Sequence, residues 1–158
     1  MSRRSLLARG GVLEKSRVVI TLAPGTTVLP LNLNGINIKI TDKNNTVLYS
    51  APAQASTNNL AIPAAPTDNQ YTIEVGKVTY LYLNSGTSLR RVLELKIKNQ
   101  AQVRMNSCTN LTEVRNIDVL ATTSLSSLFN SCTNLTTIDP FTIKDGCDCR
   151  YMFRGTKI

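Results

Sequence analysis

Hydrophobic and polar residues alternate with a period of two over most of residues 17–100. This is the pattern of strands that bury one face. The clearest runs are residues 18–22, 29–33, 36–40, 71–75, 78–83 and 93–97. Many of the apolar positions hold β-branched residues, which fit a pleated surface. The pattern predicts a mainly β protein in which residues 17–100 form a small antiparallel β-sandwich.

Turn-forming residues separate these runs and predict where strands end. Asn34-Gly35 stands between two alternating runs, and this dipeptide favours a tight two-residue hairpin. Residues 51–68 differ from the rest because they carry Pro52, Pro63 and Pro66. Since proline is excluded from central strands, we expect an edge strand around residues 60–62 and a long loop that contacts another subunit.

The C-terminal third contains an internal repeat. Asn-Ser-Cys-Thr-Asn-Leu-Thr occurs at residues 106–112 and again, without any change, at residues 130–136. A fixed period of about 20–29 residues is typical of a leucine-rich solenoid, whose units bury their apolar faces by stacking. Residues 101–158 are therefore predicted to form a short leucine-rich-repeat-like solenoid that caps the sandwich. Its predicted core consists of Met105, Cys108, Leu111, Val114, Phe129, Cys132, Leu135, Ile138 and Phe153.

The repeat resembles the BspA-type leucine-rich repeat family, whose units read approximately M-F-x-x-C-x-x-L-x-x-I-D. Residues 128–139, Leu-Phe-Asn-Ser-Cys-Thr-Asn-Leu-Thr-Thr-Ile-Asp, follow this unit, and Met152-Phe153 begin another. The resemblance implies a stacked solenoid used for surface binding, as in phage structural and bacterial surface proteins. It implies no catalytic residues.

The positive charge is concentrated at the N-terminus. The chain carries a formal net charge of +8, and residues 1–17 contribute half of it. Because residues 1–16 lack a periodic apolar face, they are predicted to form a basic arm that docks on a partner. The residues assigned to docking are Arg3, Arg4, Leu6, Leu7, Arg9, Lys15 and Arg17.

A second basic group consists of Arg90, Arg91, Lys96 and Lys98. Nucleic-acid-binding surfaces usually interleave basic residues with aromatic ones, and this group contains none. The four residues are therefore interpreted as a solvated strand face.

The composition argues against catalysis. The chain has no histidine, its carboxylates are dispersed, and it has no glycine-rich phosphate loop. We predict no enzymatic activity, catalytic residue, bound metal or cofactor. Cys108 and Cys132 occupy equivalent positions, so stacking as reduced, buried thiols is the favoured interpretation. A disulfide and a metal site that includes Cys147 and Cys149 remain the alternatives.

No segment has the pattern of a signal peptide or of a membrane span. The surface-type repeat, the basic arm and the missing signal peptide together predict a non-enzymatic structural protein of a phage virion. It would be an accessory, decoration or fibre-type subunit. It is expected to assemble in the host cytoplasm, in many copies, against other capsid or tail proteins. The alternatives are a fragment of a bacterial cell-surface adhesin and, less favoured, a basic nucleic-acid-binding protein, which would bind DNA with strong salt dependence.

Overall fold

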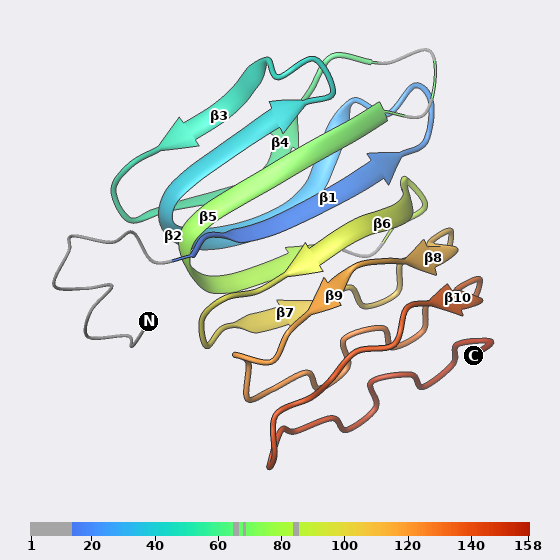
Figure 1. Cartoon of the computed structure of the whole chain (residues 1–158). Coiled ribbons are helices and arrows are strands. Elements are labelled where there is room, and N and C mark those ends of the chain that lie inside the picture. The colour runs from blue at the N-terminus through green and yellow to red at the C-terminus, as the bar shows by residue number, and fades with distance from the viewer. Residues whose placement is uncertain (1–13, 65–66, 68, 84–85) are drawn as a thin grey trace, which may run out of the picture.

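The structure, a computed structural model, describes residues 14–64, 67, 69–83 and 86–158. These residues contain no helix and form ten strands joined in one mixed sheet (Figure 1). The prediction of a mainly β protein is confirmed. The strands are β1 (Ser16–Leu22), β2 (Val28–Asp42), β3 (Val47–Ala51), β4 (Ala55–Ala61), β5 (Asn69–Leu83), β6 (Leu89–Lys96), β7 (Gln102–Arg104), β8 (Glu113–Val114), β9 (Ile117–Asp118) and β10 (Thr137–Ile138).

Strands β1 to β6 form the antiparallel body of the molecule. β2 and β5, each 15 residues long, pair over most of their length, and β1 lies between β5 and β6. The predicted alternation holds along these strands, since Leu29, Leu31 and Leu33 of β2 are each 0% exposed. Tyr71 on β5 is among the largest fully buried side chains. Alternate residues of the long strands therefore supply the core of the body.

The hairpin predicted at Asn34-Gly35 is wrong, because β2 continues through both residues. A Cβ atom on Gly35 would lie 2.5 Å from the carbonyl oxygen of Lys77 and 2.7 Å from Cγ1 of Val75. The register between β2 and β5 also shifts between Asn34 and Gly35. A glycine within a strand often marks such a bulge and a close backbone approach. Gly35 is thus required by contact with a distant strand and does not form a turn.

β3 and β4 run along the same edge of β2, with Pro52 between them. The amide of Asn37 donates a hydrogen bond to the carbonyl of Pro52, at 3.2 Å. Among the described strands, β4 pairs only with β2, so the proline-rich segment does contain an edge strand, as predicted. It begins at Ala55, earlier than the sequence pattern indicated.

The C-terminal strands pair in parallel and continue the sheet beyond β6. β7 pairs with β5, β8 and β9 pair with β6, and β10 pairs with β8. Val114 lies opposite Val92, and Ile138 lies opposite Val114, so equivalent residues of successive layers stack on one another. We refer to residues 80–158 as the parallel ladder and to its successive layers as rungs. Among the described residues, their ranges are 80–83 with 86–98, 102–120, 123–142 and 147–158.

Each complete rung after the first has two sides. A short strand segment lies on one side, and a return segment of consecutive turns lies on the other (Figure 1). The parallel ladder begins before residue 101, because the end of β5 and all of β6 form its first rung. β6 also pairs antiparallel with β1. The body and the parallel ladder are therefore joined through a shared strand.

Candidate interaction surface

The interior of the parallel ladder contains most of the residues that the repeat predicted. Seven of them are 0% exposed: Met105, Cys108, Leu111, Val114, Phe129, Cys132 and Leu135. Ile138 is partly buried against the core. Phe153 stacks on Phe129, with ring centroids 5.7 Å apart, but it remains 37% exposed. Phe153 is thus at the margin of the core and not inside it.

The first rung was not predicted from the sequence. Its sequence, Asn84-Ser-Gly-Thr-Ser-Leu89, differs from Asn106-Ser-Cys-Thr-Asn-Leu111 only at the third and fifth positions. Gly86 replaces the cysteine and forms a parallel bridge with Cys108. Leu89 is 1% exposed. A comparison that allowed the spacing between copies to vary slightly could have found this copy.

The two repeat cysteines lie inside the parallel ladder, and all four cysteines of the chain are free thiols. Sγ of Cys132 donates to the carbonyl of Met105 at 2.9 Å, and Sγ of Cys108 donates to the carbonyl of Leu83 at 3.5 Å. The hydrogen bond with Cys132 and burial both raise the pKa of the Cys108 thiol. These thiols act as small buried groups with local hydrogen-bond partners. Within the described residues, no group of three or more cysteine, aspartate or glutamate side chains is placed to hold a metal ion.

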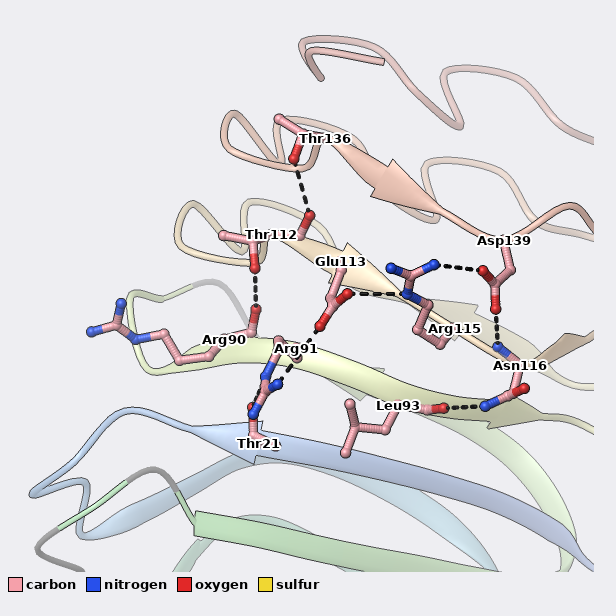
Figure 2. A network of polar contacts seen from close by, with 10 residues as sticks. All are labelled: Thr21, Arg90, Arg91, Leu93, Thr112, Glu113, Arg115, Asn116, Thr136 and Asp139. Atoms are coloured by element: carbon pink, nitrogen blue, oxygen red, sulfur yellow. Dashed lines mark hydrogen bonds and ion pairs between the residues drawn. The ribbon is translucent and has the colours of Figure 1, made fainter.

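On the outer face of the parallel ladder, charged side chains form a chain of contacts from strand to strand (Figure 2). Arg91 donates from Nε to Oγ1 of Thr21 at 3.3 Å and pairs with Glu113 at 3.7 Å. Glu113 accepts from Nε of Arg115 at 3.0 Å. Arg115 in turn donates to Oδ1 of Asp139 at 2.9 Å. Opposite charges thus alternate from β6 to the residue that follows β10.

Backbone groups complete this network. The amide of Asn116 donates to Oδ2 of Asp139 at 2.9 Å, and its side chain donates to the carbonyl of Leu93 at 2.9 Å (Figure 2). Asn116 has a positive φ of 49°, which asparagine tolerates better than most residues. The hydrogen bond from Asn116 and the nearby Arg115 lower the pKa of the Asp139 carboxyl.

Two threonines repeat the same contact from rung to rung on this face. Oγ1 of Thr112 donates to the carbonyl of Arg90 at 3.3 Å, and Oγ1 of Thr136 donates to the carbonyl of Thr112 at 3.5 Å (Figure 2). Each threonine is the last residue of one of the two identical sequence copies. Equivalent side chains thus connect each layer to the one before it.

The basic group at residues 90–98 belongs largely to this paired surface. Lys96 lies 3.1 Å from Glu94, and Lys98 contacts both Asp118 and Glu14. The hydrogen bond from Lys98 lowers the pKa of Asp118. A cation that already has a carboxylate partner offers less to phosphate, so this face fits the solvated-strand interpretation. Arg90 differs from the other three, since its side chain takes part in no ion pair with a described residue.

The residues assigned to the N-terminal arm fall into two groups. Lys15 is exposed and precedes β1, whereas Arg17 belongs to β1 and lies 3.5 Å from Glu94. Ser16 is also in β1, where it is 1% exposed and accepts a hydrogen bond from the amide of Lys98 at 2.9 Å. The sheet therefore begins at Ser16, inside the range predicted for the arm. The other assigned residues lie outside the described ones: Arg3, Arg4, Leu6, Leu7 and Arg9.

No helix in the described part of the chain is long and apolar enough to cross a membrane. No protein-family model, curated protein or solved structure matches this chain.

Proposed function

We propose that this protein is a non-enzymatic structural subunit of a phage virion, of the accessory, decoration or fibre type. The observation that carries the proposal is the stacking of near-identical sequence copies as successive parallel rungs. Such stacking repeats the same side chains at regular intervals over an extended outer face. An extended repeating surface suits binding to a partner better than chemistry on a small substrate.

At the level of architecture, we propose that the body acts as a small sandwich that caps a short BspA-like solenoid. Repeat units need a cap at the end of the stack, and two or three units rarely stand alone. β6 supports this arrangement, because it pairs with β1 on one side and with β8 and β9 on the other. β1 thereby covers the strand edge that the first rung would otherwise expose.

In this proposal the N-terminal segment docks on other virion proteins, and the parallel ladder projects from the particle. Because the sheet begins at Ser16 and Glu14 already pairs with Lys98 at 3.5 Å, the proposed docking segment is the residues before Glu14. Its charge comes from Arg3, Arg4 and Arg9, with Leu6 and Leu7 as apolar anchors. The proline-rich segment around β4 supplies a second contact, because an edge strand can pair with a neighbouring chain.

The test is incorporation into particles. Phage particles purified on a density gradient should contain the protein at a fixed stoichiometry, measured by mass spectrometry. Removal of residues 1–13 should abolish incorporation and leave the melting temperature of the body unchanged. The matched control, Lys144→Ala, changes an exposed cation at the far end and should incorporate normally.

Two results would contradict this assignment. Recovery of the protein in the cell-surface fraction, with particles free of it, would support the adhesin. Affinity for duplex DNA that falls steeply with salt would support the nucleic-acid-binding alternative.

A further inference from the structure

Most backbone hydrogen bonds between successive return segments run in one direction; the exception is the amide of Asp148, which donates back to the carbonyl of Thr123 at 3.0 Å. The amide of Met105 donates to the carbonyl of Leu128 at 2.7 Å, and that of Ser107 donates to Asn130 at 2.8 Å. The next layer repeats the pattern through four amides. Leu125, Ser127, Phe129 and Ser131 donate to the carbonyls of Asp148, Arg150, Met152 and Arg154, at distances of 2.7 to 2.9 Å. Each return segment thus presents a row of N–H donors to the rung that follows it.

The same row recurs on the fourth rung, where no described rung covers it. The equivalents of the four donors in this rung are the amides of Cys149, Tyr151, Phe153 and Gly155. None of these four amides donates a hydrogen bond to a described residue. The intervening amides of Met152 and Arg154 are used locally, since they donate to the carbonyls of Cys149 and Tyr151 at 3.2 Å. Within the described part of the chain, the outermost layer therefore carries four free donors at alternate residues.

On the strand side, β8 and β10 pair in parallel, so backbone hydrogen bonds run both ways between them, and carbonyls of β8 and its neighbours accept from the following rung. The carbonyl of Thr112 accepts from the amides of Thr136 and Thr137, and the carbonyl of Val114 accepts from Asp139 at 3.0 Å. The equivalents of these two acceptors in the next rung are Thr136 and Ile138, and β10 is the last strand of the sheet. The carbonyl of Thr136 accepts no backbone hydrogen bond from a described residue. The strand side of the same end therefore offers at least the Thr136 carbonyl as an acceptor that no described backbone amide uses.

We propose that this end face, formed by residues 136–138 and 149–155, pairs with the same face of a second copy of the chain. The strand segment and the return segment lie on opposite sides of a rung and run in opposite directions (Figure 1). A two-fold axis that lies in the plane of the end face therefore places the return segment of each copy against the strand segment of the other. The donors of each copy then face the acceptor side of its partner. Such self-complementarity is the requirement for a two-fold symmetric interface. Main-chain pairing at an exposed edge is an established mode of recognition.

The side chains at this end fit a contact between proteins. Tyr151 is 60% exposed and Phe153 is 37% exposed, and one face of Phe153 already stacks on Phe129. Aromatic residues at the centre of a small interface commonly supply much of its binding free energy. A facing copy would cover the outer face of Phe153 in the way that Phe153 covers Phe129. The inference does not depend on the virion assignment, because it concerns only how two copies of this chain meet.

The experiment is sedimentation equilibrium of the 158-residue chain over a range of concentrations, combined with amide hydrogen exchange. We expect a monomer–dimer equilibrium, with exchange of the amides of Cys149, Tyr151, Phe153 and Gly155 slowing as the dimer forms. Phe153→Glu should raise the dissociation constant at least about tenfold. The matched control, Val47→Glu, alters a residue that is 51% exposed on β3 and should leave the equilibrium unchanged.

A second pair of variants separates pairing from local unfolding. Ligation of a synthetic segment at Cys149 allows the amide bond of residue 153 to be replaced by an ester, which removes the free donor and keeps the phenyl ring. Dimerisation should weaken. The same replacement at Arg154, whose amide donates within its own rung, should leave the dissociation constant within about twofold of the wild-type value. Three results would overturn the proposal. The chain could stay monomeric at every concentration, or it could form species larger than a dimer. The dimer could also be lost in Val47→Glu and kept in the variants of residue 153.

Discussion

The antiparallel body and the parallel ladder bury their apolar residues by different means. In the body, two 15-residue strands pair over most of their length, and alternate side chains enter a common core. In the parallel ladder, strands β7 to β10 have only two or three residues each. There, single side chains such as Val114 enter the core, and turns carry the rest of each layer. Long strands are thus not needed when equivalent positions recur at a regular spacing.

This difference has consequences for stability. Each long strand of the body pairs with other strands on both sides. A destabilising substitution in one strand should therefore lower the stability of the whole antiparallel sheet. A layer of the parallel ladder contacts mainly the layers before and after it, which is the behaviour of a quasi-one-dimensional stack. We therefore expect substitutions in the body to act globally. Substitutions far along the parallel ladder should act locally.

The largest effect is expected for Gly35→Ala in the body. The added Cβ atom would lie 2.5 Å from the carbonyl oxygen of Lys77, a backbone atom that cannot move without shifting β5. Urea unfolding should show a loss of about 3 kcal/mol, because overpacking against fixed atoms forces the backbone to shift. Since β5 also belongs to the first rung, the body and the parallel ladder should lose stability together.

Gly25→Ala is the matched control for this prediction. Gly25 has a φ of +77°, but a Cβ atom there would meet no atom within 4 Å. Only the cost of the left-handed backbone conformation applies, about 1 kcal/mol. Similar losses for the two variants would show that the contact between β2 and β5 relaxes easily, and that the body is less tightly packed than the structure indicates.

The second prediction compares one leucine from each region. Leu31 of β2 and Leu135 of the third rung are both 0% exposed, so truncation of either to alanine should cost about 3 kcal/mol in its own surroundings. Leu31→Ala should lower the global unfolding free energy by this amount. Leu135→Ala should instead speed hydrogen exchange in residues 125–158 and change the global transition much less. Equal global losses for both variants would mean that the stack and the body unfold as one unit.

The sequence predicted most of the strands and the repeat because both leave periodic signals. The alternation along residues 29–33 and 71–75 marks buried strand faces, and the copies at residues 106–112 and 130–136 mark stacked layers. Both signals are local or repeated without change, so they can be read without knowledge of distant contacts.

The errors have a common physical cause. Asn34-Gly35 has the local chemistry of a turn, but the glycine serves a close approach to Lys77 on another strand. The first rung escaped detection because Gly86 stands where later copies have a cysteine and because its spacing from the next copy is slightly shorter. Arg17 was assigned to the arm by its charge, although its partner Glu94 lies far along the chain. In each case the role of the residue depends on a contact with a distant part of the chain, which the local sequence pattern does not indicate.

The third prediction concerns the buried thiols of the parallel ladder. Cys132→Ser should cost about 1 kcal/mol, at the low end for a buried polar group, because the hydroxyl can donate to the carbonyl of Met105 as the thiol does. Cys132→Ala removes this donor and should cost more. Thermal melting of both variants under reducing conditions measures the difference. A larger loss for serine than for alanine would mean that the hydroxyl finds no partner in this layer.

Thiol reactivity offers an independent check on the same region. Titration of unfolded protein without reductant should find four free thiols, and fewer would indicate a disulfide. Burial raises the pKa of Cys149 to about 11. Since the unfolded thiol ionises at lower pH than the folded one, the contribution of Cys149 to stability is complete below about pH 9. It should be lost as the pH rises toward 11.

The smallest effect is expected for Asp139→Asn on the outer face of the parallel ladder. The amide of Asn116 and the guanidinium of Arg115 lower the pKa of the Asp139 carboxyl. A carboxyl whose pKa is lower in the folded state stabilises the fold above its unfolded pKa, and this contribution disappears as the pH falls through the folded value. The melting temperature of the wild-type protein should therefore decrease on acidification below about pH 4.

In Asp139→Asn, this decrease should be shallower but still present, because the pKa values of Asp118 and Asp148 are also lowered. Thr142→Ala, an exposed uncharged control nearby, should keep the wild-type profile. An unchanged profile in Asp139→Asn would show that the network in Figure 2 orients side chains without contributing to the pH dependence of stability, as many exposed ion pairs do.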